Sequence, residues 1–171
     1  MAPWIAHLRI AEALSDGILL DKTAFAYGSL APDSGKPNAD STAFDPPKEI
    51  THFLNHGESE DQIRDIEFYQ DYVLTSPHFE DNFEDYSFRR GYFFHLLCDN
   101  LWSRRLMTTY KQLYPELIDN PNHPMWQTIK HDWYRMIVSR ITNRVGLADR
   151  KHSGVYLLPI RVWNYVMIRG I

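Results

Sequence analysis

Apolar and polar residues alternate along most of this chain with the period of α-helices. In the first segment apolar residues recur at Ile5, Leu8 and Leu14, and Pro3 stands where the first turn of a helix accepts proline. Comparable patterns occur four more times, and one of these segments contains Gly91, where we expect a bend. The pattern therefore predicts helices over 3–20, 58–74, 82–110, 124–145 and 158–168. The β-branched residues of the last segment leave a strand there as the alternative.

Residues 21–45 interrupt the helical pattern. Residues 23–30 fit a short helical turn, but the following stretch, APDSGKPNADSTAFDPPKE, is dense in Pro, Gly, Ser and Asp and predicts a loop without regular structure. A loop of this length inside a compact domain is usually functional or disordered. The chain has neither an internal repeat nor a shift in composition that would mark a domain boundary. The expected fold is therefore all-α, a single-domain helical bundle spanning residues 1–171.

Composition and charge argue against several classes of protein. The chain has 171 residues, of which 44% are hydrophobic, enough for one domain with a sizeable core. A formal net charge of −4 argues against a dedicated binder of duplex nucleic acid, which normally has a basic face. Cys98 is the only cysteine, which excludes an intrachain disulfide and a cysteine-based zinc cluster. No stretch reaches the roughly 18 apolar residues of a membrane span, and the polar N-terminal segment is unlike a signal peptide, so we expect a soluble, cytoplasmic protein.

The stretch GYFFHLLCDNLWS, residues 91–103, contains the first candidate site. His95 and Asp99 lie four residues apart, and this spacing places both side chains on one face of a helix. A carboxylate among aromatic and aliphatic neighbours needs a partner. Two interpretations fit the pair. Imidazole and carboxylate both bind zinc, so the two residues can share a metal ion, or they form a buried hydrogen bond that holds two helices together.

Three more candidate ligands precede this stretch. His7 and His52 each lie beside apolar residues, and Asp33 lies in a Pro-Asp-Ser-Gly turn. With His95 and Asp99 they make a set of three histidines and two aspartates from four segments, which suits a hydrolytic metal site in a helical domain. Each residue also has a structural interpretation. Asp33, for example, is placed to cap its turn.

Four segments of the chain resemble the zinc-dependent phospholipase C family: PWIAHLRIAE, FAYGSLAPDSG, FDPPKEITHF and GYFFHLLCDNLW. That family has an all-α fold similar to the fold of the single-strand-specific zinc nucleases. The resemblance implies one metal position formed by Asp33, His52, His95 and Asp99. It places His7 at a neighbouring position that shares Asp99 as a bridging carboxylate. It also implies that Asp33 is the general base that orients or deprotonates the attacking water.

The chain departs from the family pattern at three places. Trp4 is internal, whereas in the secreted enzymes a processed N-terminal Trp donates its amine and carbonyl to a metal. The family's next histidine is missing, because residues 102–105 read Trp-Ser-Arg-Arg. A later His-x-x-x-Glu or His-x-x-x-Asp is missing as well, since His131 is followed four residues later by Arg135, and the nearest substitutes are Asp132 and His131 itself. We therefore expect one or two zinc ions, or another divalent transition metal, rather than three.

The function that the resemblance implies is a metal-dependent phosphoester hydrolase. Water activated by the metal would attack phosphorus with Asp33 as base, and a small phosphorylated substrate fits an acidic chain better than bulk phospholipid or long nucleic acid. The charge that develops on the phosphoryl oxygens calls for a cation from the protein. The candidates are Arg89, Arg90, Arg104, Arg105 and Lys130.

Two other functions also fit the sequence. The chain can be a metal-binding module of the same fold that has lost catalysis, because ligands after Asp99 are missing. It can also be a His-Asp type phosphohydrolase, in which the adjacent His131 and Asp132 bind metal together with an upstream His95 and a distant Asp149. The second alternative leaves the PWIAH and LAPDSG segments unexplained.

Overall fold

The computed structural model describes residues 4–15, 20–40, 42–75, 82–117, 120, 123–128 and 131. The chain divides into two compact units, residues 1–103 and residues 104–171. The described residues are mostly helical, with one small two-stranded sheet, so the predicted mainly helical class is confirmed. A compact unit is not the same as an independently folding domain, and the single domain over 1–171 stays a prediction.

Most elements of the first unit are short. They are α1 (Trp4–Ser15), α2 (Lys22–Gly28), η1 (Ala31–Asp33), β1 (Lys36–Pro37), β2 (Phe44–Asp45), α3 (Lys48–Thr51), η2 (Glu60–Gln62), α4 (Asp65–Phe68), η3 (Tyr69–Leu74) and α5 (Phe83–Leu101). The chain continues through a π-helical stretch, η4 (Trp102–Met107), into α6 (Thr108–Leu113) and η5 (Pro115–Leu117).

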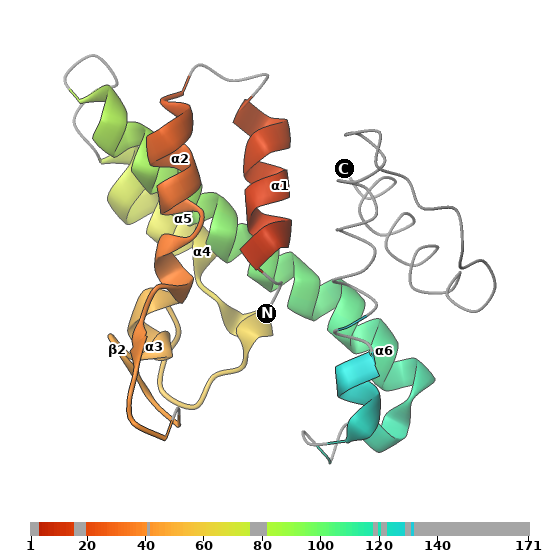
Figure 1. Cartoon of the computed structure of the whole chain (residues 1–171). Coiled ribbons are helices and arrows are strands. Elements are labelled where there is room, and N and C mark those ends of the chain that lie inside the picture. Colours follow the sequence, from red (N-terminus) through yellow and green to blue (C-terminus); the bar gives the residue numbers. More distant parts are fainter. Residues whose placement is uncertain are drawn as a thin grey trace. The chain divides into compact units, whose positions relative to one another are not determined.

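The long helix α5 is the element against which the rest of the first unit packs (Figure 1). It begins after Asn82, whose side chain accepts a hydrogen bond of 3.0 Å from the backbone N–H of Asp85 and so caps the helix. Helices α1 and α2 pack against it, and α4, η2 and η3 also contact it. Residues that face these elements along α5 are therefore buried at the centre of the unit.

Two glycines allow the backbones of α2 and α5 to touch. A Cβ atom on Gly91 would lie 2.1 Å from the carbonyl oxygen of Phe25, and a Cβ atom on Gly28 would lie 2.0 Å from the carbonyl oxygen of Phe88. Both distances are far inside van der Waals contact, and the atoms met are backbone atoms that cannot rotate away. The glycine that suggested a bend in the sequence is thus required for close helix packing.

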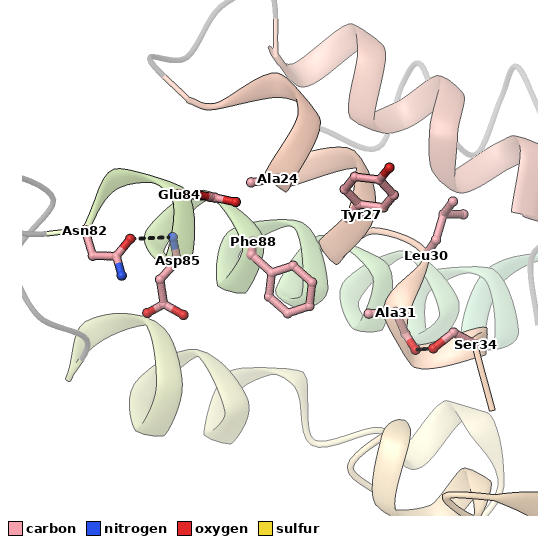
Figure 2. Close-up of a pocket in the computed structure, with 9 residues that line it drawn as sticks. All are labelled: Ala24, Tyr27, Leu30, Ala31, Ser34, Asn82, Glu84, Asp85 and Phe88. Carbon is pink, nitrogen blue, oxygen red and sulfur yellow. Dashed lines mark hydrogen bonds between the residues drawn. The ribbon is translucent and has the colours of Figure 1, made fainter. Parts of the chain in front are cut away.

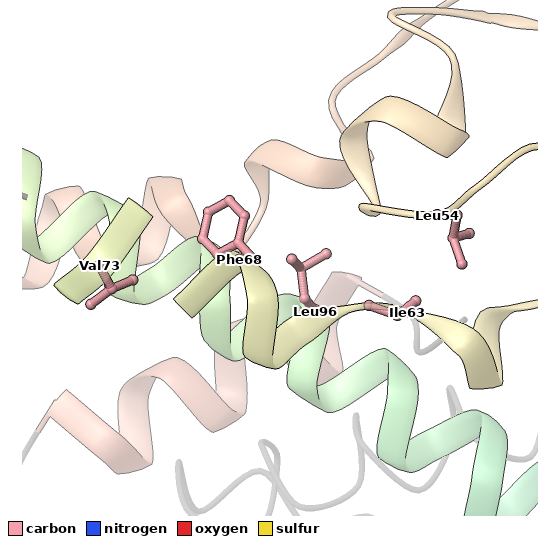
Figure 3. Packing of buried hydrophobic residues seen from close by; sticks show 5 residues of the cluster. All are labelled: Leu54, Ile63, Phe68, Val73 and Leu96. Carbon is pink, nitrogen blue, oxygen red and sulfur yellow. The ribbon is translucent and has the colours of Figure 1, made fainter. Parts of the chain in front are cut away.

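A cluster of apolar side chains fills the space between α5 and the segments before it (Figure 3). Its buried members are Leu54, Ile63, Phe68, Val73 and Leu96. Leu96 comes from α5 and is fully buried. A second cluster of Ala11, Leu20 and Phe25 lies among α1, α2 and α5, so apolar packing holds both sides of the long helix.

The prediction of one helix over 58–74 is wrong in its first half. Ile63 is extended, with φ −53° and ψ 127°, so the chain leaves η2 before α4 begins. Ser59 and Gln62 form a capping box that turns the chain at η2, and the extended segment delivers Ile63 to the core, where it is 2% exposed. The helical spacing of the apolar residues therefore arose from two separate elements.

The irregular segment 21–45 contains more structure than predicted. Residues 22–28 form α2, and β1 and β2 pair as an antiparallel hairpin in which Lys36 faces Asp45 and Pro37 faces Phe44. The side chain of Asn38 accepts hydrogen bonds of 2.9 and 3.1 Å from the N–H groups of Thr42 and Ala43, which stabilises the turn.

The other predicted helices agree with the structure as far as it describes them. Residues 3–20 contain α1, and 82–110 are helical from residue 83 onward, with η4 as an internal π-helical stretch. Most of 124–145 and all of 158–168 lie outside the described residues. Among the helices that are described, none combines the length and the apolar character needed to cross a membrane.

Gly91→Ala tests the close packing of α2 against α5. Helix propensity alone would make the variant more stable by about 1 kcal/mol, because alanine is the better helix former. We expect the opposite sign, a loss of about 1–3 kcal/mol in the free energy of unfolding, because the added methyl group meets the backbone of α2. Urea unfolding of the variant, with the exposed Glu84→Ala on the same helix as control, measures the difference. A stabilised Gly91→Ala would contradict the close contact.

Candidate metal centre

The five predicted ligands come together in the interior of the first unit. His7 lies on α1, Asp33 ends η1, His52 directly follows α3, and His95 and Asp99 lie on α5. Each of these side chains is at most 5% exposed. We call these five residues the His/Asp cluster.

Three atoms of the cluster lie at nearly equal separations, and a fourth lies close to one of them. The Nε2 atoms of His52 and His95 are 3.4 Å apart, and each is 3.5 Å from Oδ2 of Asp99. Oδ1 of Asp33 lies 3.3 Å from Nε2 of His52. These separations are longer than the roughly 2.7–3.2 Å that is typical of hydrogen bonds between nitrogen and oxygen.

A hydrogen bond from Nδ1 orients the ring of His95. Nδ1 of His95 lies 2.8 Å from the backbone carbonyl oxygen of Ser29. A carbonyl oxygen can only accept a hydrogen bond, so Nδ1 carries a proton and Nε2 is the nitrogen that faces the interior of the cluster. Ser29 directly follows α2, so the close contact between α2 and α5 sets the orientation of this ligand.

Thr51 orients His52 in a similar way. Its Oγ1 lies 3.0 Å from Nδ1 of His52 and 3.4 Å from the carbonyl oxygen of Lys48. When the hydroxyl donates to that carbonyl, it accepts from Nδ1–H and leaves Nε2 of His52 facing the carboxylates. Burial acts to lower the pKa of His52, but hydrogen bonds to Asp33 and Asp99 outweigh burial and raise it, so Nε2 favours a bound proton or a metal ion. The hydroxyl of Tyr92 on α5 donates to the carbonyl oxygen of Thr51 at 2.5 Å and fixes the segment in place. Nε2 of His52, Nε2 of His95 and a carboxylate oxygen of Asp99 thus face one another, an arrangement that can hold a metal ion.

His7 approaches the other oxygen of the Asp99 carboxylate. Its Nε2 lies 3.3 Å from Oδ1 of Asp99, and its ring stacks on His95 with the centroids 3.8 Å apart. Neither ring nitrogen of the buried His7 has a hydrogen-bond partner, and neither has Oδ2 of Asp33. Buried polar atoms are rarely left in this condition, and metal coordination is one way to satisfy them.

Electrostatics keep both carboxylates ionised. Burial acts to raise the pKa of Asp99, but its interactions with the three histidines outweigh burial and hold that pKa far below the usual range. Burial also acts to raise the pKa of Asp33, yet His52 and the charge of His95 more than offset it, so this pKa is lowered too. Burial lowers the pKa of His7 and favours its neutral form. Two buried negative charges beside a neutral imidazole are stabilised by a bound cation.

The separations fit a metal ion. Zinc ligands lie about 2.0–2.2 Å from the ion, so neighbouring ligand atoms of a tetrahedral site are about 3.3–3.6 Å apart. The three separations among Nε2 of His52, Nε2 of His95 and Oδ2 of Asp99, 3.4–3.5 Å, fall within that range, and so does the 3.3 Å between His52 and Asp33. The buried histidines and aspartates can therefore hold a metal ion.

A hollow of about 240 Å³ lies beside the cluster. Asp33 and His52 belong to both the hollow and the cluster, so the hollow gives access to the candidate ligands. It is lined by Trp4, Pro32, Asp33, Gly35, Phe44, Pro46, Lys48, Thr51 and His52. The sequence interpretation missed Lys48, although its position four residues before His52 at the start of a helical turn places both on one side.

A larger hollow of about 620 Å³ lies elsewhere on the first unit (Figure 2). Its walls come from α2, η1 and the start of α5, and none of the five cluster residues lines it. Its polar groups serve local structure. Asn82 caps α5, Asp85 pairs with Arg89 at 2.7 Å, and Ser34 donates to the carbonyl oxygen of Ala31 at 2.7 Å. The smaller hollow is therefore the better candidate for a substrate site.

None of the four expected arginines is among the described residues that line the smaller hollow. Arg89 binds Asp85 and the carbonyl oxygen of Tyr72, and Arg90 donates to the hydroxyl of Tyr86 at 2.6 Å. Arg104 and Arg105 belong to the second compact unit. Lys130, Asp132 and Asp149 lie outside the described residues, and His131 is exposed.

Comparisons of the chain with protein-family models, with curated proteins and with solved structures give no match. The resemblance to zinc-dependent phospholipase C therefore rests on the sequence motifs, and the metal centre on the geometry.

His52→Ala and His56→Ala form a matched pair for testing metal binding. The side chain of His52 is 1% exposed in the cluster, whereas that of His56 is fully exposed. We expect protein purified without chelator to contain a divalent transition metal, and we expect a chelator to lower its melting temperature. His52→Ala should lose most of the metal because it removes a ligand, and His56→Ala should keep it. Elemental analysis measures both, and equal metal contents in the two variants would contradict the assignment.

Thr51→Val tests the group that orients His52. The variant keeps the shape of the side chain but removes the acceptor for Nδ1–H. Loss of such a partner typically lowers metal affinity about 10–100-fold, and we expect a decrease in this range. Competition with a chromophoric chelator measures the affinity, and the exposed Thr75→Val is the control. An unchanged affinity in Thr51→Val would show that Thr51 does not orient the ligand.

Proposed function

We propose that the chain is a metal-dependent phosphoester hydrolase with a phospholipase C-like helical fold that uses one or two zinc ions. The observation that carries this proposal is the convergence of two buried histidines and a buried aspartate at the spacing of zinc ligands, beside an accessible hollow. The sequence motifs support zinc and phosphoester chemistry, because the residues of these motifs are the ones that converge.

The residues of the His/Asp cluster would have different roles in such a site. His52, His95 and Asp99 would hold one ion, and His7 with the second carboxylate oxygen of Asp99 would contribute to a neighbouring position. A bound divalent ion polarises a phosphoryl oxygen and lowers the pKa of water from 15.7 toward about 7. Asp33 borders the hollow and has a lowered pKa, so it is ionised at neutral pH and able to orient the attacking water and accept its proton.

The size of the hollow favours a small substrate. A volume of about 240 Å³ is below the roughly 300–1,000 Å³ typical of sites for drug-sized ligands. At about 30 Å³ per water molecule, it holds on the order of eight waters. A phosphoryl group with a short organic substituent fills such a space, whereas a nucleic acid strand or a lipid chain would extend beyond it.

A binding module that has lost catalysis is the second candidate. The absence of the family's histidine from residues 102–105 favours it, because the full three-metal centre cannot form in the usual way. Both candidates bind metal in the same cluster, so turnover and not metal content separates them.

Asp33→Asn tests the hydrolase directly. We expect the metal-loaded protein to hydrolyse at least one small phosphomonoester or phosphodiester from a chromogenic panel. Removing a general base costs about 10²–10⁴-fold in rate, so Asp33→Asn at saturating metal should lower kcat by that factor. Asp40→Asn, in the exposed hairpin turn, should leave kcat unchanged. Metal-loaded protein without activity on the whole panel would favour the binding module.

A further inference from the structure

Lys48 is placed beside the candidate metal centre by a single helical turn. It begins α3, and His52 follows the end of that helix, so the two residues are four apart. The backbone N–H of His52 donates to the carbonyl oxygen of Lys48 at 2.8 Å, which keeps them on the same side of the turn. Lys48 and His52 both line the smaller hollow, together with Asp33.

Lys48 supplies the positive charge of that hollow. The nine lining residues all belong to the described part of the chain, and Lys48 is the one lysine or arginine among them. Its Nζ forms an ion pair with Oε1 of Glu60, and its side chain is 36% exposed. The ion pair restricts the ammonium group without using all its donors, because an ammonium group has three.

We propose that Lys48 binds the anionic phosphoryl group of the substrate in the smaller hollow. The inference rests on the proposed function and names a binding residue for that same site. An ammonium group is a strong donor to phosphoryl oxygens, and charge-assisted hydrogen bonds of this kind are about twice as strong as neutral ones. The arginines expected from the sequence do not line the hollow, so Lys48 takes the role they were expected to have.

Binding of inorganic phosphate to the full-length, metal-loaded protein tests the inference without requiring turnover. Isothermal titration calorimetry gives the Kd for the wild type, for Lys48→Ala and for Lys48→Arg, with metal content measured for each. We expect Lys48→Ala to raise the Kd about tenfold or more, because each 1.4 kcal/mol of lost binding is tenfold. Lys48→Arg should keep much of the affinity. Lys36→Ala, at an exposed position of β1, is the matched control.

Glu60→Gln is expected to change the phosphate affinity in the opposite direction from Lys48→Ala. It removes the charge that competes for Lys48, so we expect phosphate to bind more tightly than to the wild type. The gain should vanish when Glu60→Gln is combined with Lys48→Ala, because the ammonium group is then absent. A gain that persists in the double variant would show that phosphate is held elsewhere and would overturn the inference.

The remaining outcomes separate this inference from the proposed function. Unchanged phosphate affinity in Lys48→Ala with full metal content overturns the role of Lys48, and so does a wild type that binds no phosphate at millimolar concentration. If Lys48→Ala loses its metal, phosphate affinity is measured instead on Lys48→Gln, which retains a long polar side chain, and the same two outcomes apply. A wild type that binds phosphate through Lys48 but hydrolyses no ester supports the inference and contradicts the hydrolase.

Discussion

Two buried imidazole nitrogens and a buried carboxylate that face one another are the constraint on which the first unit depends. His95 has its proton committed to a backbone carbonyl, His52 has its proton committed to Thr51, and Asp99 is an ionised carboxylate with no exposure to water. Bringing such groups together costs free energy unless a cation compensates for the lost hydration. The packing of α1 and α2 on α5 therefore does two things, since it buries the core and it holds a site that favours a positive ion.

The orientation of the ligands comes from backbone packing as much as from side chains. Gly28 and Gly91 let α2 lie directly on α5, and the residue after α2 then presents its carbonyl oxygen to His95. On the other side, Tyr92 of α5 holds the carbonyl of Thr51 and so fixes the residue that orients His52. The contacts that pack the helices thus also position the groups that orient the imidazoles, and a change in helix packing would turn those rings.

The sequence could predict these ligands because their chemistry is unusual in its local setting. His95 and Asp99 have helical spacing in an apolar segment, and the structure confirms that they share a helix. Other features of the fold depend on contacts between distant segments, and the periodicity of apolar residues along the sequence does not reveal such contacts. Gly91 suggested a bend but serves close packing, and Ile63 fitted a helical stripe but is extended into the core. Lys48 was missed because its role arises only when α3 closes against η1.

The spread of the ligands along the chain has a consequence for the unfolded state. His95 and Asp99 are neighbours in one helix, but His7, Asp33 and His52 lie far from them in sequence, so metal ions bound across the whole cluster close several loops at once. Closing a loop removes chain entropy that grows only slowly with its length, by about 0.6 kcal/mol for each doubling. Metal ions bound across the whole cluster would act on this chain as a set of disulfides acts on a secreted domain, joining four segments in a protein whose one cysteine permits no such link within the chain.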